Sequence, residues 1–285
     1  MEWDCHVHMI LDGKYWKSAI ASHASAPDYT IIRAALERWQ ARGVTYLRDG
    51  GDRWGVGAAA RRIAPEYGIE YRTPLAPLCK AGHYGAFLGI SYENEREYAG
   101  LVKNTKTNGG DFIKIMISGL MDFNTFGRLT EEGLTAREIT SCIHIAHEEG
   151  MAVMVHGNGA ANMEAAANAG ADSIEHGAYA DDAALHAMAE NGTVWVPTLS
   201  TIGNLRGKGR FDERAVEKIL ESAMENTAAF AAAGGMIAPG SDAGAFAVPH
   251  GCDTEEGLLL QALGEGGASL LRAGAETIRR KFVVR

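Results

Sequence analysis

Several signals that would assign the chain to other protein classes are missing from its 285 residues. No apolar run approaches the roughly 20 residues needed to cross a bilayer. The start of the chain, MEWDCHVHM, lacks the basic region and apolar stretch of a signal peptide. Basic residues are also few, with 27 Lys and Arg against 36 Asp and Glu, and no basic stripe could follow a phosphate backbone. We therefore expect a cytoplasmic protein that binds neither membrane nor nucleic acid.

Cysteine is scarce, and its spacing excludes further classes. The four cysteines contain no CxxC pair, which argues against a zinc knuckle and a disulfide framework. A GxSxG nucleophile elbow is absent as well. Cys5 adjoins His6, but strand alternation is expected to point the two side chains apart. If the chain is an enzyme, we expect water to be its nucleophile.

Glycine, in contrast, is abundant, with 35 of 285 residues, or about 12% against a usual ~7%. Many of these glycines follow predicted strands and helices, which suits a fold with many strand-to-helix loops. A hydrophobic content of 46% is enough for one large core. Because α/β barrels often form one unit of roughly 250 residues, a single domain over residues 1–285 is expected.

Short apolar runs alternate with longer amphipathic stretches along the whole chain. The expected strands are 3–8, 44–48, 70–78, 112–117, 152–156, 173–176, 193–198 and 236–240. The expected helices are 28–42, 54–67, 93–107, 130–149, 159–169, 181–191, 212–233 and 254–273. Eight strands, each followed by a helix, predict an α/β fold with a single (β/α)8 TIM-like barrel. An open sheet would more naturally place its site at one switch point, whereas polar residues here end many strands.

Metal-binding residue types recur at the ends of these strands. His6 and His8 lie two apart on one strand, so their side chains share a face and can chelate one ion. Such a pair can also be satisfied by hydrogen bonds alone. His156, His176 and Asp242, however, end or follow three further strands. Since the carboxyl ends of the strands meet at one end of a barrel, we expect all five to converge on a metal site.

Lys114 lies inside the apolar strand Phe-Ile-Lys-Ile-Met-Ile. A buried ammonium there is costly unless it is paired or chemically altered, and burial should lower its pKa. A neutral amine can add carbon dioxide and become a carbamate, an anionic ligand able to bridge two metals. The alternative is an unmodified lysine paired with a carboxylate such as Asp242.

This combination of residues resembles the amidohydrolase superfamily, and within it the branch related to imidazolonepropionases and metal-dependent Xaa-Pro and Arg/Lys dipeptidases or carboxypeptidases. The resemblance runs from Asp4 to about Gly257. It implies a binuclear centre, with zinc as the expected metal and carbon dioxide bound as a carbamate on Lys114. The implied roles are His6, His8 and Asp242 for the first ion, His156 and His176 for the second, and carbamylated Lys114 as the bridge. His83, in a glycine-and-histidine loop, and Tyr84 are the implied substrate-binding residues.

Superfamily members commonly carry a small β-sandwich built from residues on both sides of the barrel. These 285 residues show neither flank, so we expect a barrel without that domain. The barrel face that the sandwich normally covers would then be exposed. Such a face favours a homo-oligomer or a polar replacement surface.

Three hypotheses for the function remain open. The leading one is hydrolysis of a C–N amide bond in a small molecule, with dipeptides or N-acyl amino acids implied by the resemblance. Two ions about 3.5 to 4 Å apart can share a hydroxide and polarise a carbonyl, with Asp242 as general base. The alternatives are ring opening or deamination of a cyclic amidine or imidazolone, and a barrel that has lost catalysis. Loop arginines that bind a carboxylate, for which Arg206 and Arg210 are candidates, would favour the first.

Three acidic residues are expected to have structural roles. Glu175 precedes His176 and, by strand alternation, should face the helices and not the site. Asp49 and Asp52 should organise the loop that follows the second strand.

Overall fold

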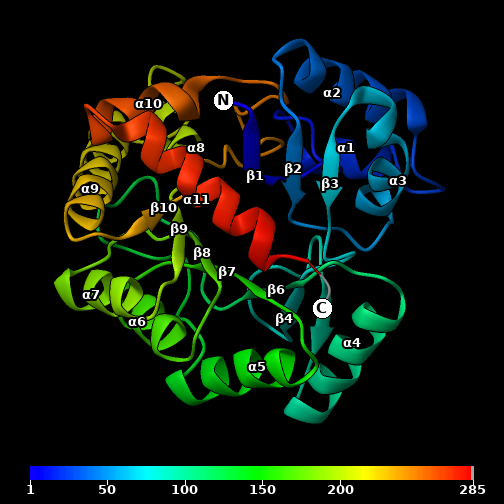
Figure 1. The fold of residues 1–285 in the computed structure, drawn as a ribbon, viewed down its shortest axis with the longest axis horizontal. Coiled ribbons are helices and arrows are strands. Elements are labelled where there is room, and N and C mark those ends of the chain that lie inside the picture. Colours follow the sequence, from blue (N-terminus) through cyan, green and yellow to red (C-terminus); the bar gives the residue numbers. More distant parts are fainter. Residues whose placement is uncertain (284–285) are drawn as a thin grey trace.

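The computed structural model describes residues 1–283. In this part of the chain, ten strands form two parallel sheets with helices packed around them (Figure 1). One sheet has the order β1 (Trp3–Val7), β2 (Tyr46–Asp49), β3 (Glu70–Arg72). The other has the order β10 (Met236–Ile237), β9 (Val194–Val196), β8 (Ser173–His176), β7 (Val153–Gly157), β6 (Ile113–Met116), β4 (Leu78–Lys80), β5 (Ile90–Tyr92). The strand pairs are parallel throughout, which confirms the predicted α/β class with a parallel sheet.

Most of the helices lie where the amphipathic pattern predicts them. They are α1 (Trp16–Ala21), α2 (Tyr29–Ala41), α3 (Val56–Ile63), the 3-10 helix η1 (Ala64–Tyr67), α4 (Glu95–Thr107), α5 (Ala136–Glu148), α6 (Ala160–Asn168), α7 (Asp182–Glu190), α8 (Ser200–Gly203), α9 (Glu213–Ala232), α10 (Thr254–Leu263) and α11 (Gly267–Lys281). Side-chain caps begin α2, α4, α7 and α9, where Asp28, Asn94, Asp181 and Asp212 accept hydrogen bonds from the first-turn amides. The short helices α1 and α8, which the sequence did not predict, lie in the two long connections after β1 and β9.

The predicted strand 70–78 was wrong in extent. The chain forms β3 and β4 there, and the two strands belong to different sheets. Pro74 and Pro77 lack the N–H that a strand interior needs, and Leu75 between them has a φ of 65°. The strand β5, which pairs with β4, was not predicted.

Two predicted helices were also wrong in extent. The helix expected at 130–149 begins only at Ala136, because Thr135 and Glu138 form a reciprocal capping box. The helix expected at 254–273 is divided into α10 and α11, because Gly264 and Gly266 both have positive φ. Glycine adopts this backbone without the steric cost that other residues meet, so it stops one helix and starts the next.

The two sheets face a common interior, and backbone hydrogen bonds join their edges. Beside β1, the amide of Cys5 donates to the carbonyl of Pro239 at 2.8 Å, and the amide of His8 donates to that of Ala243 at 2.7 Å. At the other edge of the three-stranded sheet, the amide of Asp111, just before β6, donates to the carbonyl of Thr73, just after β3, at 2.9 Å. Cys5 and Tyr46 of the first sheet also pack with Met154, Val194 and Val196 of the second in one apolar cluster.

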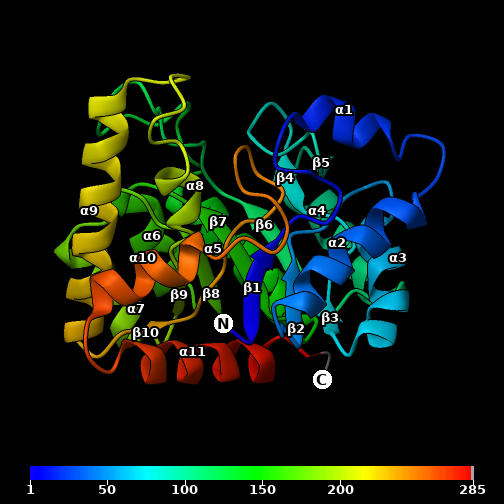
Figure 2. The same cartoon turned by 90° about the horizontal axis from the view of Figure 1, so that it is seen from above.

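The two ends of this interior differ. Figure 2 shows α11 lying across one end of the strands, while the loops after the strands, with α1 and α8, lie at the opposite end. Ile278 of α11 and the following Phe282 are fully buried against Phe112 in one apolar cluster. A Cβ at Gly274 would come within 1.9 Å of the carbonyl oxygen of Ile237, so α11 packs directly on the backbone of β10. Within residues 1–283, no helix is both long and apolar enough to span a membrane.

Candidate metal centre

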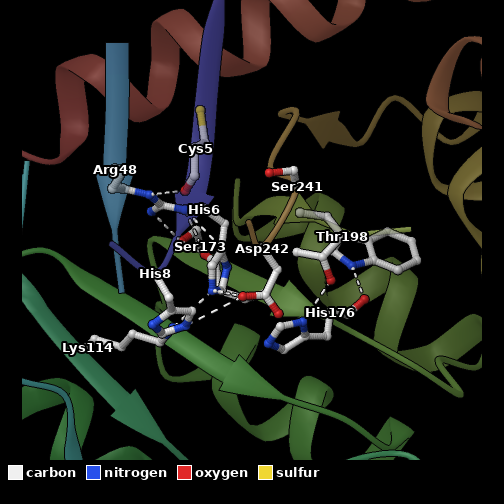
Figure 3. A network of polar contacts seen from close by, with 12 residues as sticks. Cys5, His6, His8, Arg48, Lys114, Ser173, His176, Thr198, Ser241 and Asp242 are labelled. Carbon is white, nitrogen blue, oxygen red and sulfur yellow. Dashed lines mark hydrogen bonds and ion pairs between the residues drawn. The ribbon is translucent and has the colours of Figure 1, made fainter. Parts of the chain in front are cut away.

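The six residues predicted as metal ligands lie together, with Lys114 inside β6 and the other five near or beyond the carboxyl ends of their strands. They are His6, His8, Lys114, His156, His176 and Asp242, and all are buried. Lys114 Nζ lies 3.0 Å from His6 Nε2 and 3.5 Å from His8 Nε2. Asp242 Oδ1 lies 3.6 Å and 3.5 Å from the same two nitrogens (Figure 3). The ring of His176 is centred 5.1 Å from that of His6 and 4.6 Å from that of His156.

Two departures from regular strand geometry help to bring these side chains inward. Between Asp4 and Val7 the register shifts, since β1 advances three residues while β2 advances two, from Leu47 to Asp49. At the end of β8, His176 has a φ of 68°, in the left-handed region. A non-glycine residue in this region is strained, and such strain is concentrated at functional sites. Asp242, with a φ of 55°, has the same feature.

The left-handed backbone at His176 explains why the prediction for Glu175 was wrong. Glu175 is fully buried in the interior, where its Oε2 lies 2.7 Å from Nδ1 of His6. Regular alternation would then send His176 outward. The altered backbone at His176 instead directs both neighbouring side chains to the site.

Two glycines allow the loops to approach the histidines closely. A Cβ at Gly50 would lie 2.2 Å from Cε1 of His8. A Cβ at Gly240 would lie 2.9 Å from the Cβ of His6 and 2.4 Å from a methyl carbon of Val196. No side chain fits at either position without moving a histidine or its support.

Buried polar groups fix the orientation of the histidine rings. Nδ1 of His6 contacts Glu175, and Nδ1 of His176 lies 2.7 Å from Oγ1 of Thr198. These contacts leave Nε2 of both rings facing the centre. Nε2 of His156 lies 3.3 Å from the carbonyl oxygen of Gly119, so Nδ1 of His156 is the ring nitrogen left to bind a metal. Ring nitrogens anchored in this way are typical of metal-binding histidines.

The donor atoms fit a divalent metal ion. One atom each from His6, His8 and Asp242 can be chosen so that all lie within 4.8 Å of one another. Among the described residues, Nδ1 of His8 and Oδ1 of Asp242 are buried without a hydrogen-bond partner, which is costly unless another group satisfies them. Imidazole nitrogen with carboxylate oxygen is a donor set that suits zinc and related transition metals.

Burial also changes the protonation of the centre. Burial lowers the pKa of Lys114 to about 8, against the opposing effect of Asp242 and Glu175. Burial raises the pKa of Asp242 to about 7, although the charge of Lys114 opposes this. Within residues 1–283, Lys114 Nζ contacts imidazole nitrogens and makes no ion pair with Asp242. The structure thus differs from the simple lysine–carboxylate pair that the sequence left open.

Comparison with known proteins assigns this arrangement to a family. The model of the amidohydrolase family matches residues 4–272. The chain belongs to the amidohydrolase family. Ochratoxinase of Aspergillus niger is 26% identical over 232 residues, which cover 70% of this chain and 47% of that protein. The chain therefore spans about half the length of the curated relative that it matches.

Solved structures of similar fold agree with the amidohydrolase assignment. The A. niger ochratoxinase structure has a TM-score of 0.81 at 21% identity, covering 99% of this chain and 71% of that one. A Xaa-Pro dipeptidase with bound methionine in its active site has a TM-score of 0.76 at 22% identity, covering 99% and 77%. At this level of identity, the two structures show a shared fold.

A cavity of about 780 Å³ opens above the candidate centre of this amidohydrolase. His8, His176 and Asp242 line its floor. Of the two predicted substrate-binding residues, Tyr84 lines the cavity, and its ring is centred 4.9 Å from that of His156. His83 is half-buried outside the cavity lining, with Nδ1 3.7 Å from Glu131. The structure thus places Tyr84, but not His83, where a ligand would bind.

Sequence reasoning missed the residues that support this amidohydrolase centre. Arg48 is fully buried and donates to Glu175 at 2.8 Å, to Ser173 at 2.9 Å and to the carbonyl of Cys5 at 2.7 Å (Figure 3). The sequence did contain a sign of this role, because Arg48, like Lys114, is a charged residue in a predicted strand. Asp4, which accepts from the amide and hydroxyl of Ser241, gave no comparable signal.

The two loop aspartates have the structural roles that were predicted for them. Asp49 accepts from the amide of Met9 at 3.1 Å and from the hydroxyl of Thr73 at 3.1 Å. Asp52 accepts from the amides of Trp54, Val56 and Gly57 and so holds the start of α3. Both aspartates stabilise the loop after β2.

A buried carboxyl group near the Asp242 loop should make stability depend on pH. Glu255 of α10 is fully buried, accepts from the amide of Ser200 at 2.6 Å, and has no partner for Oε1 among the described residues. Burial raises its pKa from 4.5 to about 8. The unfolded chain therefore releases this proton first, and the folded state loses stability as the pH rises from about 5 to 8. Urea unfolding of Glu255→Gln should show a smaller loss over that range than the native protein.

The matched control is the exposed Glu265→Gln, which should retain the native pH dependence. If Glu255→Gln and native protein lose stability equally between about pH 5 and 8, Glu255 is not the group responsible.

Proposed function

We propose that this chain is a metal-dependent hydrolase that cleaves a C–N amide bond in a small molecule, with dipeptides or N-acyl amino acids as its substrates. The observation that carries the proposal is the convergence of four histidines, Lys114 and Asp242 on one centre, of which His8, His176 and Asp242 line the cavity. Membership of the amidohydrolase family supports hydrolysis. The names of a relative and a similar structure, ochratoxinase and Xaa-Pro dipeptidase, support an amide substrate.

The proposal includes a closed (β/α)8 barrel over the whole chain. Hydrogen bonds at both edges between the two sheets support closure, with Cys5–Pro239 and His8–Ala243 at one and Asp111–Thr73 at the other. The parallel pairing and the helices around the sheets agree with it. In a barrel, residues at the carboxyl ends of the strands carry the chemistry, which is where the six side chains lie.

The proposed centre holds two ions, with zinc the expected metal. His6, His8 and Asp242 would hold one ion, His156 and His176 the other, and Lys114, as a carbamate, would lie between them. When bound, such ions lower the pKa of a water molecule and polarise a carbonyl group. The chain's own contribution is to orient the ligands, through Glu175 on His6 and Thr198 on His176.

Asp242 is the proposed general base. Its amide donates to the carbonyl of His6 at 2.7 Å, which fixes the loop beside β1, and its carboxylate faces the cavity. The carboxylate can accept a proton from the attacking water and later release it to the leaving nitrogen. Cleavage of a C–N bond needs both transfers, so one residue can serve both halves of the reaction.

Metal content per chain tests the proposed centre directly. Protein produced with zinc and bicarbonate should contain about two metals per chain, and Lys114→Ala about one or fewer, because the variant lacks the proposed bridging ligand. Plasma mass spectrometry measures this content. The control is Lys103→Ala, an exposed lysine of α4, which should retain the native content.

The other outcomes distinguish the alternative functions. One metal per chain in both the native protein and Lys114→Ala would contradict the carbamate bridge and favour deaminase-type substrates. No metal in either protein would favour a barrel without catalysis.

A further inference from the structure

The cavity above the candidate centre has one wall built from a row of aromatic rings. The ring of Tyr84 is centred 4.9 Å from that of His156, and the next ring outward, Phe87, is 5.6 Å from Tyr84. Trp16 of α1 follows, 5.4 Å from Phe87. Tyr84, Phe87 and Trp16 all line the cavity, and Trp16 is 44% exposed. The row offers ring faces and edges to a ligand from the centre to the mouth.

A second group of cavity residues has a different chemistry. The guanidinium of Arg210 lies 4.0 Å from the ring centre of Phe246 and 5.3 Å from that of Phe211, and all three residues line the cavity. Stacking on two rings restricts the guanidinium, and its N–H groups have no hydrogen-bond partner in the described part of the chain. Among residues 1–283, no carboxylate forms an ion pair with Arg210, whereas the cavity residue Arg128 has Asp122 at 3.9 Å.

The loop that carries Arg210 is held in place at both ends. The amides of Gly207 and Gly209 donate to the carboxylate of Glu213, at 2.9 and 3.1 Å. The amide of Asp212 donates to Asn124 Oδ1 at 3.1 Å, which ties the loop to another cavity segment. These hydrogen bonds fix the loop, and with it the position of Arg210, in the lining of the same cavity that Asp242 lines.

From these two features we propose that the substrate is an amide with an aromatic ring on one side of the scissile bond and a carboxylate on the other. Arg210 binds the carboxylate, and the row Tyr84–Phe87–Trp16 binds the ring. This inference rests on the proposed amide hydrolase function and makes it more specific. The planar guanidinium can pair with both carboxylate oxygens at once, which gives it an advantage over Lys14, a cavity lysine that also has no ion pair within residues 1–283.

Binding of ligands that cannot be hydrolysed as amides tests the inference without turnover. Four sulfonamides form the set: N-benzenesulfonyl-leucine, N-methanesulfonyl-leucine, and the carboxamide of each. Titration calorimetry on metal-loaded protein measures their Kd. Since all four share the sulfonamide, any contact of that group with the metal is common to the set.

Arg210→Gln should raise the Kd of both carboxylate ligands by about tenfold and leave both carboxamides within about twofold. Phe87→Leu should raise the Kd of both benzenesulfonyl ligands by about fivefold and leave the methanesulfonyl pair unchanged. The matched control Arg206→Gln should change no Kd, because Arg206 lies in the same loop but outside the cavity lining. Thermal unfolding of each variant verifies that it is folded.

Two results would overturn the inference. One is a loss of carboxylate binding in Lys14→Gln but not in Arg210→Gln. The other is an equal loss for carboxylates and carboxamides in Arg210→Gln, which would indicate a structural role for the arginine. If the binding pattern holds but N-benzoyl-leucine is not hydrolysed, the proposed function fails and the ligand assignment stands. If N-benzoyl-leucine is hydrolysed but the binding pattern is absent, the proposed function stands and the ligand assignment fails.

Discussion

Replacement of Asp242 by asparagine should lower kcat for amide hydrolysis by about 10²- to 10⁴-fold, the contribution typical of a positioned general acid–base group. Asparagine keeps the size of the side chain and one carbonyl oxygen, but it cannot accept and release the proton. Initial rates of amino acid release from N-benzoyl-leucine or a dipeptide give kcat and KM. Because the proposed transfers occur during reaction, kcat should fall more than KM rises.

Two measurements separate this effect from loss of metal. Metal content per chain of Asp242→Asn, measured on the same sample, shows whether ions are retained, and rates are then expressed per metal-loaded protein. Asp122→Asn, at another acidic residue of the cavity lining, is the matched control and should change kcat by less than about threefold. Native kcat in metal-loaded Asp242→Asn would contradict the general-base role.

Replacement of Arg48 by methionine should lower the free energy of unfolding by about 3 to 5 kcal/mol, the cost of breaking a buried ion pair. Arg48 and Glu175 are both fully buried, and methionine would leave the carboxylate of Glu175 without its cation. The same change removes hydrogen bonds to Cys5 and Ser173 and the packing of the guanidinium on Phe282, 4.3 Å from its ring centre. Urea unfolding followed by circular dichroism measures the loss.

An exposed ion pair provides the control. Arg33 is paired with Glu66 at the surface, and Arg33→Met should cost less than about 1 kcal/mol. In addition, the double variant Arg48→Met with Glu175→Leu should recover part of the stability lost in Arg48→Met, because no unpaired charge remains. Equal losses in Arg33→Met and Arg48→Met would show that the buried pair does not have the assigned energetic role.

The six candidate ligands could be located from sequence because parallel strands impose one simple rule. The ends of neighbouring parallel strands lie side by side, so His156, His176 and Asp242 had to approach His6 and His8, however distant they are in sequence. This inference needs only the direction and order of the strands. Small errors in the bounds of strands do not affect it.

Features that depend on local backbone geometry could not be inferred in this way. Alternation along an ideal strand sent Glu175 away from the site, since neither the register shift in β1 nor the left-handed φ of His176 has a sequence signature. The cavity walls were missed for a related reason. Trp16, Phe87 and Phe246 lie in connections whose conformations are set by tertiary contacts, and hydrophobic periodicity does not describe such segments.

Arg48 could have been recognised by the argument that identified Lys114. Both are charged residues within apolar strands, and both are buried in the interior. The sequence shows that each needs a partner, but it does not reveal which one. Arg48 donates to the carboxylate of Glu175, which in turn contacts His6, whereas Lys114 lies among the imidazoles of the centre itself.

The helix α11 affects how reaction products can leave. This helix covers the end of the interior opposite the cavity, where Phe282 packs against Phe112. Under the proposed amide hydrolysis, substrate would enter and both fragments would leave through the cavity above the candidate centre. The fragment nearer the mouth must diffuse away first, and the fragment left deeper inside competes with the next substrate molecule. For the proposed reaction we therefore expect release of the outer fragment first and competitive inhibition by the inner fragment.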